Sequence, residues 1–458
     1  MFDRASARFI FLATTIASFL TPFMGSSVNV ALPAIGKEYN MTAISLGWVA
    51  TAFLLASAIT LVPLGRLADI YGRKKMFTSG AVILGLACMA SVWSPTEAVF
   101  IFFRSLQGVG AAMIFSTGTA LLISAYPPEN RGEILGMNVA SVYVGLTVGP
   151  FIGGVLTEHL GWKTIFIFSA FLAAGAAVCS LKIAEEEPPE ARKETFDGWG
   201  CLLYAAALFA LMYGFSRLPS KIGVVLVMVG LLCLALFARS QWKKDFPLLN
   251  VHLFAGNRTF AFSNLAALIN YCATFAVTFL LSLYLQHIKM MTPSETGMVL
   301  LVSPLLQALF SPLAGRLSDR YEPRYISSVG MMLTVLGLSG MIFISEETPL
   351  SLIVICLVVL GIGFALFSSP NVNAVMSSVE SRDYGVASAT LATMRMVGQM
   401  LSMGIAMLFF ALFIGDQNLT GENDVSLIQS ARWIFVVLTA ICVLGVFSSL
   451  VRGRVHKR

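Results

Sequence analysis

The chain has 458 residues, of which 57% are hydrophobic and 12% are charged, with a mean hydropathy of +0.82. Soluble domains carry roughly 25% charged residues, so this composition excludes a soluble globular protein and indicates an integral membrane protein. The net charge of +6 does not indicate nucleic-acid binding, because the basic residues follow a membrane topology.

Fourteen apolar runs have about the 20 residues that a helix needs to cross a bilayer. The predicted spans are 9–31, 45–64, 77–93, 98–125, 133–157, 163–182, 199–215, 222–239, 260–284, 295–314, 326–344, 350–370, 384–414 and 431–451. Lys and Arg gather in the segments on the side of both chain ends and are sparse in the opposite loops. By the positive-inside rule, both ends are therefore predicted to be cytoplasmic.

The first span carries a stripe of small and polar residues at steps of three and four, namely Thr14, Ser18, Thr21, Gly25 and Asn29. Such a stripe lies on one helical face and should point toward protein or water, or should pack against another helix through its small residues. The span at 260–284 repeats the same steps with Ser263, Ala267, Asn270, Thr274 and Thr278. The repetition predicts a chain built from two corresponding halves.

The segment between the second and third spans, residues 65–75, reads GRLADIYGRKK, and a related phrase, GRLSDR, returns at residues 315–320. An acid and an arginine four apart can pair across one helical turn, and glycines allow tight bends. A generic positive-inside connector is the alternative reading. We predict two short charged hinges and assign a conformational role to Gly65, Asp69, Gly72, Arg73, Gly315, Asp319 and Arg320.

The fourth span contains Arg104 and Gln107 on one face. An arginine at the centre of a membrane helix costs roughly 2.5–3.5 kcal/mol on insertion scales. It should therefore face a cavity in the transport pathway or bond to carbonyls of neighbouring helices.

The fifth span contains the phrase GLTVGPFIGG at residues 145–154. Glycines at steps of four make a groove that lets another helix approach closely, and the proline favours a bend. We assign a conformational role to Gly145, Gly149, Pro150, Gly153 and Gly154.

The second half offers four further polar residues inside predicted spans: Asn270, Asn371, Arg395 and Gln399. Asn371 follows a proline, which frees backbone groups that can line a cavity. For Arg395, a structural bond between helices and a role in transport are both open. Residues 185–194 are charged and contain two prolines, so they are predicted to be a cytoplasmic linker.

The chain resembles the fourteen-helix drug:proton antiporters of the major facilitator superfamily. The resemblance rests on the hinge pair, the arginine phrase of the fourth span, the glycine–proline phrase of the fifth span, residues 26–33 at the end of the first span, and the division of the predicted spans into six, two and six. The resemblance implies an all-α membrane protein with an N-terminal six-helix bundle (1–183), a linker with two additional helices (184–257) and a C-terminal six-helix bundle (258–458). It also implies alternating access around a central cavity, with a substrate or proton pathway formed by Asn29, Arg104, Gln107, Asn270, Asn371, Arg395 and Gln399. Asp69 and Arg73 would form a cytoplasmic lock that favours the outward-open state, with Asp319 and Arg320 as a weaker counterpart.

One departure concerns the coupling proton. The antiporters commonly carry an aspartate where this chain has Met24, and no acidic residue lies well inside a predicted span. Coupling through Asp69, through an acid at a helix end or through water ordered by Arg104 remains open. Because Arg104 and Arg395 are the charges that lie well inside the predicted spans, the cavity is expected to accept neutral or anionic substrates as readily as cations.

The expected function is proton-coupled efflux of amphipathic drugs or toxic compounds, and the alternative is an exporter or uptake carrier for a specific metabolite, with an anionic one among the options. No cluster of catalytic or metal-ligating residues is visible, and the seven cysteines are dispersed, so neither an enzyme nor a metal or cofactor site is expected. The partners are then a small-molecule substrate and the lipid bilayer, with no nucleic acid. We expect a monomer in a prokaryotic plasma membrane.

Overall fold

The computed structural model describes residues 4–126, 128–183, 197–242, 244, 248, 251–380, 384–415, 417 and 424–453. The N-terminal part forms α1 (Arg4–Tyr39), α2 (Ala43–Tyr71), α3 (Arg73–Val92), α4 (Glu97–Ala125), α5 (Pro128–Leu160) and α6 (Lys163–Leu181). The middle forms α7 (Gly198–Arg217), α8 (Lys221–Gln241) and α9 (Val251–Gly256). The C-terminal part forms α10 (Arg258–Leu283), a π-helix (Tyr284–Ile288), α11 (Pro293–Leu300), α12 (Val302–Arg320), α13 (Pro323–Met341), α14 (Leu350–Ser377), α15 (Tyr384–Phe413) and α16 (Asp424–Val451).

Side-chain caps fix where several of these helices begin. Thr42 accepts a hydrogen bond from the third residue of α2, and Asp197 and Ser220 do the same for α7 and α8. At α11, Thr292 and Glu295 form a reciprocal capping box. Such caps satisfy amide groups that the first helical turn leaves without partners.

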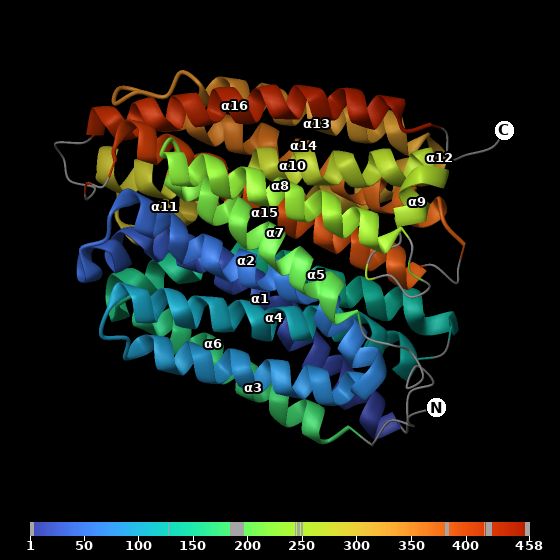
Figure 1. Cartoon of the computed structure of the whole chain (residues 1–458). Helices are drawn as coiled ribbons and strands as arrows, with labels where there is room; N and C mark the ends of the chain where they lie inside the picture. The colour runs from blue at the N-terminus through green and yellow to red at the C-terminus, as the bar shows by residue number, and fades with distance from the viewer. Residues whose placement is uncertain are drawn as a thin grey trace.

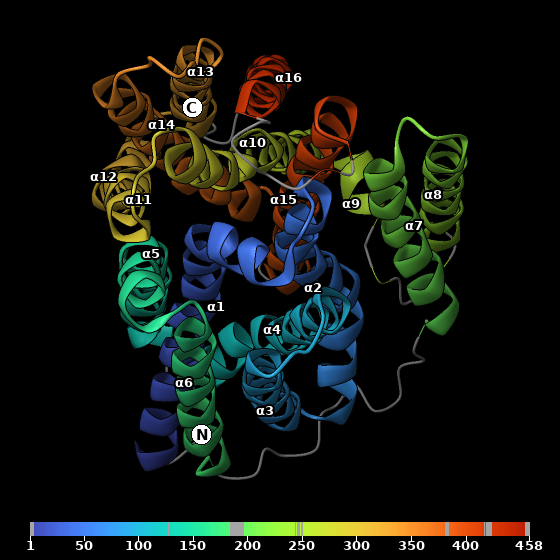
Figure 2. The same ribbon diagram turned by 90° about the vertical axis from the view of Figure 1, so that its left-hand side faces the viewer.

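The helices form two bundles, and both chain ends lie at the same end of the molecule (Figure 1). Seen from the opposite end, α1–α6 and α10–α16 face each other, and α7 and α8 stand as a pair on the flank (Figure 2). This pair contacts the bundles where α7 packs on α2 and α15. We call the end with the chain ends the inner end, which the positive-inside rule assigns to the cytoplasm, and the other the outer end.

Thirteen helices in the described part of the chain are long and apolar enough to cross a membrane. The predicted span 326–344 coincides with α13, which is helical and packs on α14 and α16 but is not among the thirteen. The all-α membrane fold with two bundles and two additional helices is confirmed, while the count of fourteen spans is not. Residues 184–196, which contain the predicted linker, lie outside the described residues.

Close glycine crossings are repeated in the two bundles. Between α3 and α4, a Cβ atom added to Gly110 would lie 2.8 Å from the carbonyl oxygen of Gly80. Between α13 and α14, a Cβ atom added to Gly363 would also lie 2.8 Å from the carbonyl oxygen of Gly330. Only glycine allows backbones to approach this closely, so the repeat that the sequence predicted from polar stripes is also present in helix packing.

A second crossing follows the same rule and involves the stripes themselves. A Cβ atom on Gly145 of α5 would lie 2.4 Å from the Phe19 carbonyl oxygen, and one on Gly398 of α15 would lie 2.5 Å from that of Leu268. Phe19 and Leu268 each follow the second member of their stripe. Helices α1 and α10 are therefore corresponding elements held against α5 and α15 in the same way.

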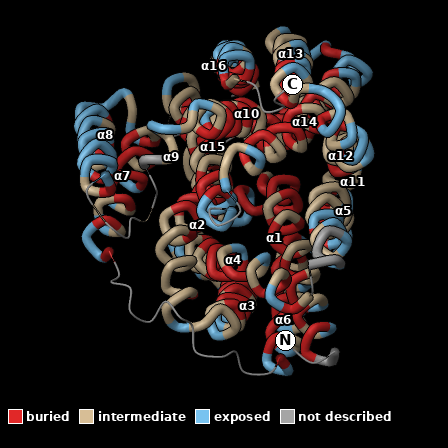
Figure 3. Tube along the Cα trace, turned by 90° about the vertical axis from the view of Figure 1, so that its right-hand side faces the viewer, coloured by how far each residue is buried: buried red, intermediate tan, exposed pale blue. Residues whose placement is uncertain are grey.

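The helices differ in how much of their surface is buried against other helices. Buried residues gather on the inward-facing sides of the helices in both bundles, whereas α8 is largely exposed along its length (Figure 3). An exposed helix made of apolar residues is expected where the surrounding solvent is hydrocarbon.

The predicted hinges differ from the observed structure. Residues 65–71 continue α2 as regular helix, and the break is confined to Gly72, which has a φ of 104°. Residues 315–320 likewise lie within the last turns of α12. The prediction of charged hinges outside the helices was wrong, because a helix can extend beyond its apolar run into the polar interface, where charged residues are as well accommodated as in a connector.

Candidate functional site

Arg104 lies inside the N-terminal bundle and is 2% exposed. Its Nε donates to the Val49 carbonyl oxygen on α2 at 3.0 Å, and its Nη1 donates to Gln107 Oε1 at 2.7 Å. The guanidinium also lies 4.9 Å from the centre of the Phe53 ring, a favourable cation–π distance. These contacts match the alternative in which Arg104 joins neighbouring helices.

Gln107 extends the same network to α3. It is fully buried, and its amide nitrogen lies 3.3 Å from both the Ala87 carbonyl oxygen and Ser91 Oγ. The pair predicted from the fourth span thus ties α2, α3 and α4 together. A part for Arg104 and Gln107 in the substrate or proton pathway stays a prediction.

A second polar cluster lies between the two bundles and contains residues that the sequence did not single out. Tyr143 of α5 accepts a hydrogen bond of 3.3 Å from Ser311 of α12. Ser368 of α14, Tyr271 of α10 and Arg395 of α15 lie near enough to the same phenol to influence it electrostatically. One side chain from the N-terminal bundle therefore bonds to one and lies near three more from the C-terminal bundle, and we call these five residues the interface cluster.

Arg395 supplies the positive charge of the interface cluster. Its Cζ lies 5.5 Å from the centre of the Tyr271 ring, and its Nε is buried without a hydrogen-bond partner. It stands about 17 Å from the inner end of α15, given ~1.5 Å per residue, which places it near the middle of the membrane. Gln399 follows one turn further along α15 and is half-buried. The predicted pair Arg395 and Gln399 thus lies on one stretch of α15 at mid-depth.

Aromatic rings surround the guanidinium. The rings of Tyr271 and Phe364 meet edge to face with their centres 5.2 Å apart, and Gly398 lets α15 approach the Tyr271 side chain closely. The arrangement offers a flat apolar surface beside a cation and two phenol hydroxyls. Such a surface can stack on a planar ring and donate hydrogen bonds to its acceptors.

The two predicted asparagines of the second half are placed differently. Asn270 is fully buried, and both polar atoms of its amide lack a hydrogen-bond partner. Asn371 donates to the Ser263 carbonyl oxygen at 3.1 Å and accepts from Arg452 Nη1 at 2.8 Å. Asn371 therefore serves a buried network at the inner end of the C-terminal bundle.

Arg452 was missed because it comes directly after the last predicted span. It is fully buried, and burial lowers the pKa of its guanidinium to about 9, so it stays charged near pH 7. Its Nε and Nη2 have no partner among the described residues. In the sequence, a basic residue just beyond an apolar run counts only as one of the cytoplasmic charges of the positive-inside rule, and tertiary packing alone shows that this one is buried.

The bundles meet at their outer ends. Ser282 Oγ of α10 donates to the Asn29 carbonyl oxygen of α1 at 2.6 Å, and Gln286 Nε2 donates to the Val30 carbonyl oxygen at 2.9 Å. Asn29 is 3% exposed. The predicted pathway residue Asn29 thus lies in a contact that closes the outer side.

The glycine–proline phrase of α5 completes this outer closure. A Cβ atom on Gly154 would lie 2.3 Å from the Pro293 carbonyl oxygen of α11, and one on Gly297 would lie 2.2 Å from the Pro150 carbonyl oxygen. Each helix thus places a glycine against the other's backbone. Gly154 and Pro150 therefore lie at the contact between the bundles, and their conformational role stays a prediction.

The remaining glycines of the phrase face their own bundle. Cβ atoms on Gly149 and Gly153 would meet Ser26 and Ser27 of α1 at 1.9 Å and 2.6 Å, and Gly145 meets the same helix at Phe19. The groove that the spacing predicted is therefore filled by α1. A conformational role for these three glycines remains a prediction.

At the inner end, Asp69 and Arg73 pair as expected across one turn. Arg73 Nη2 lies 2.9 Å from Asp69 Oδ1, and both side chains are about two-fifths exposed. Asp319 and Arg320 lie exposed at the end of α12. The structure thus places these charges at corresponding ends of the two bundles, and the proposed lock remains untested.

Gly65 and Gly315 also occupy corresponding places. A Cβ atom on Gly65 would lie 3.4 Å from Ser116 of α4, and one on Gly315 would lie 3.1 Å from Ser369 of α14. Both glycines are helical and let a neighbouring helix approach near the inner end.

Acidic residues in the described part of the chain lie near helix ends or in loops, and no group of three metal-ligating residues was found there. The buried carboxylate among them is Asp197, which binds the Gly200 amide, Gln241 and Lys244. Burial alone would raise the pKa of Asp197, but these partners lower it below its ordinary value. Asp197 therefore anchors α7 against α8 as a charged cap.

Comparison with known proteins gives one consistent result. A family model described as Major Facilitator Superfamily matches residues 14–242 and 264–458. The chain is 27% identical to the riboflavin transporter RibZ of Clostridioides difficile (strain 630), over 95% of each chain. It is 30% identical to the multidrug resistance protein Stp of Mycobacterium tuberculosis (strain CDC 1551 / Oshkosh), over 86% of this chain and 74% of that protein. Among solved structures, a bacterial homolog of the human lysosomal transporter Spinster, in an inward-facing and unoccupied conformation, superposes with a TM-score of 0.70 at 16% identity, over 98% and 97% of the two chains.

Proposed function

This chain belongs to the Major Facilitator Superfamily, and we propose that it exports amphipathic small molecules by alternating access between its two bundles. It is a transporter of the plasma membrane and not an enzyme. Export, the substrate class and the energy source are the parts that we propose. Similarity to a multidrug resistance protein over most of the chain supports the direction.

The interface cluster is the observation that carries the proposal. It lies where two bundles would move against each other, and it combines residues from both. Arg395 contributes a cation whose Nε has no partner among the described residues, while Tyr143 and Tyr271 contribute rings and hydroxyls. An alternating-access site needs groups from both bundles, so that one substrate can contact both in turn.

The charge of this cluster favours neutral or anionic substrates over lipophilic cations. A cationic substrate brought next to Arg395 would be repelled, and the described part of the chain holds no acid at this depth to compensate. A planar substrate with carbonyl or carboxylate groups would stack on Tyr271 and accept hydrogen bonds from the guanidinium.

A carrier for one specific metabolite is the second candidate. The observation that favours it is the similarity to a riboflavin transporter over 95% of both chains. A flavin has the flat, neutral and acceptor-rich ring that the interface cluster would suit. The two candidates therefore differ in the breadth and direction of transport and share the same site.

We also propose the proton gradient as the energy source. The supporting argument is the resemblance to proton antiporters, because no described acid lies near the interface cluster. Asp69 is the acidic residue that a conformational coupling would use, since it lies at the inner end of α2, which packs on α15 of the other bundle.

The test uses energised inside-out membrane vesicles containing the protein, in which an exporter fills the lumen. Three flat fluorescent compounds are compared: riboflavin (neutral), fluorescein (anionic) and ethidium (cationic). We expect riboflavin and fluorescein to accumulate and ethidium not to. Arg395→Gln should lower fluorescein accumulation at least tenfold, and Arg395→Lys should lower it less because the charge is kept.

The outcomes separate the parts of the proposal. Accumulation of ethidium alone would overturn the charge argument and leave export intact. Riboflavin uptake by right-side-out vesicles without accumulation in inside-out ones would favour the metabolite carrier. If none of the compounds moves in correctly inserted protein, export of flat aromatic compounds is refuted, and accumulation that survives collapse of the pH gradient would refute proton coupling.

A further inference from the structure

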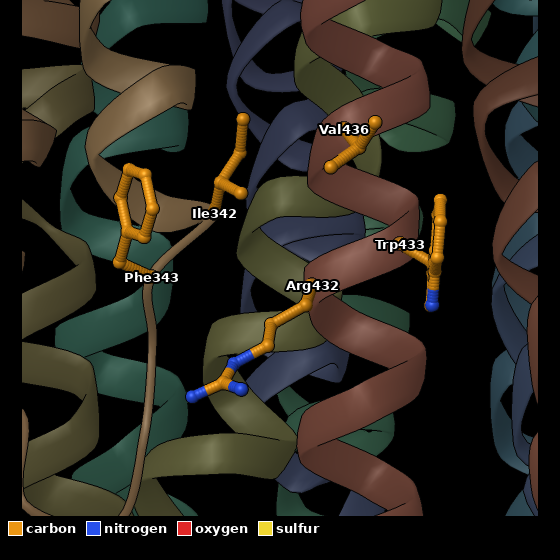
Figure 4. Close-up of a pocket in the computed structure, with 5 residues that line it drawn as sticks. All are labelled: Ile342, Phe343, Arg432, Trp433 and Val436. Carbon is orange, nitrogen blue, oxygen red and sulfur yellow. The ribbon is translucent and has the colours of Figure 1, made fainter.

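A groove on the membrane-facing flank lies apart from the interface cluster. It has a volume of about 330 Å³ and is lined by Ile342, Phe343, Arg432, Trp433 and Val436. It lies between the outer end of α13 and the first turns of α16, as the close-up shows (Figure 4). Phe343 and Trp433 are 76% and 51% exposed, so aromatic rings flank an otherwise aliphatic floor.

Arg432 is held at one end of this groove. Its Nε donates to the Ile344 carbonyl oxygen at 2.7 Å. Within the described residues, no hydrogen bond to protein was found for its two terminal nitrogens. Figure 4 shows the guanidinium extending on the side of Arg432 away from Val436. The groove thus has a charged end and an apolar end.

The polarity of the groove runs along the membrane normal. Helix α16 has 28 residues, about 42 Å at ~1.5 Å per residue, which matches the ~40–45 Å of a bilayer with its headgroups. Arg432 lies eight residues after Asp424 at the outer end, so its Cα is about 12 Å deep. The side chain leans back toward the outer surface, which brings the guanidinium to the level where phosphates meet hydrocarbon.

We propose that this groove binds a phospholipid of the outer leaflet. Its phosphate accepts hydrogen bonds from the terminal nitrogens of Arg432, and an acyl chain lies over Val436 and Ile342 between the rings of Phe343 and Trp433. Guanidinium and phosphate match in charge and in planar geometry. Aromatic residues at this depth are typical of the interface.

A guanidinium that merely reaches water would explain the orientation of Arg432 but not the groove beside it. The two explanations predict different lipid preferences. Solvation by water is indifferent to the lipid headgroup, whereas the proposed site selects lipids that carry a phosphate. The proposal does not depend on the substrate or on the direction of transport.

The experiment measures quenching of Trp433 fluorescence in full-length protein by lipids with brominated acyl chains. Phosphatidylglycerol is compared with digalactosyldiacylglycerol, which has no phosphate, at equal chain length. The part of the quenching that disappears in Trp433→Phe isolates the signal of this groove. We expect the phospholipid to bind about fivefold more tightly than the glycolipid.

Variants then locate the origin of the preference. Arg432→Gln should bring the ratio of the two affinities close to one, and Arg432→Lys should give an intermediate ratio. Arg217→Gln is the matched control, because Arg217 is also an exposed arginine at the outer end and should leave the ratio unchanged. Val436→Trp fills the groove and should weaken both lipids.

Three results would overturn the proposal: equal affinities in the unchanged protein, a preference that survives Arg432→Gln, or the same loss in Arg217→Gln. Should Arg432→Gln not fold, the comparison of the two lipids in unchanged protein and the effect of Val436→Trp still decide the question.

Discussion

Two adjacent glycines of α5, Gly153 and Gly154, allow a test that distinguishes an effect on the outer closure from an effect on the folding of the N-terminal bundle. An alanine at Gly154 would place its Cβ 2.3 Å from the Pro293 carbonyl oxygen in the other bundle. An alanine at Gly153 would place its Cβ 2.6 Å from the Ser27 side chain in the same bundle. We therefore expect Gly154→Ala to strain the outer-closed arrangement alone, and Gly153→Ala to strain the N-terminal bundle in every state.

The size of the effect follows from the overlap. A carbon–oxygen contact needs about 3 Å, so the backbones at Gly154 must separate by several tenths of an ångström. Overpacking of this kind costs about 1–3 kcal/mol. If the outward-open state is free of the clash, the equilibrium shifts toward it by about 5- to 150-fold.

The assay is electron–electron double resonance between spin labels at Ala98 and Glu347, which are exposed at the outer ends of the two bundles. The background replaces the seven native cysteines. Gly154→Ala should enlarge the population with long distances, and Gly297→Ala should do the same because it contacts Pro150 from the other side. Unchanged distances in both, or an equal shift in Gly153→Ala, would refute the assignment of this contact to the outer closure.

Three further predictions concern buried charges, and thermal unfolding of purified protein measures each. Asp197→Asn should lower the free energy of unfolding by about 1–2 kcal/mol, because the charged helix cap and the ion pair with Lys244 are lost. Since the pKa of Asp197 is lowered in the folded protein, its contribution to stability is present above about pH 4 and is lost as the pH falls further. The variant should therefore lack that part of the acid dependence of stability. Arg104→Gln should cost about 1–3 kcal/mol by leaving buried acceptors unpaired, whereas unchanged stability with lost transport would favour a pathway role. Asn371→Leu should cost about 2–3 kcal/mol because it removes a partner of charged Arg452, and adding Arg452→Met should recover most of this loss; no recovery would contradict the inferred pairing.

The fold was predictable because it depends on features that are local in sequence. Apolar length gave the helices, and the polar stripes of the first and ninth spans predicted the repeat that the close approaches of Gly145 and Gly398 now display in packing. Boundaries were harder, since residues 65–71 are helical beyond the apolar run. The glycine pair Gly80 and Gly110 was not recognised, because a crossing between two helices has no fixed spacing along one chain.

The candidate site was predictable only in part, for a physical reason. Buried polar residues can be counted from sequence, but whether each one meets its own bundle or the opposite one depends on helix rotation. Arg104 and Arg395 look alike in sequence, but their packing differs. Arg104 joins helices within the N-terminal bundle, whereas Arg395 lies between the two bundles. Tyr143 and Tyr271 gave weaker signals, because a single intramembrane tyrosine is also common at sites that only pack.

The position of Arg395 between the bundles has a consequence for the electrostatic cost of the proposed transport cycle. Closing the bundles around Arg395 removes a cation from water, and a lone arginine in the membrane costs roughly 2.5–3.5 kcal/mol on insertion scales. An anionic substrate would offset this cost in the loaded protein, because the site then moves without net charge. The empty protein must close over the unpaired guanidinium, with only the Tyr271 ring and the polar groups of the cluster to stabilise it. The step in which the empty protein returns to its starting state is therefore the one that a proton, a counter-anion or a second substrate would assist. In this reasoning, coupling acts on the empty carrier and not on the binding of the exported compound.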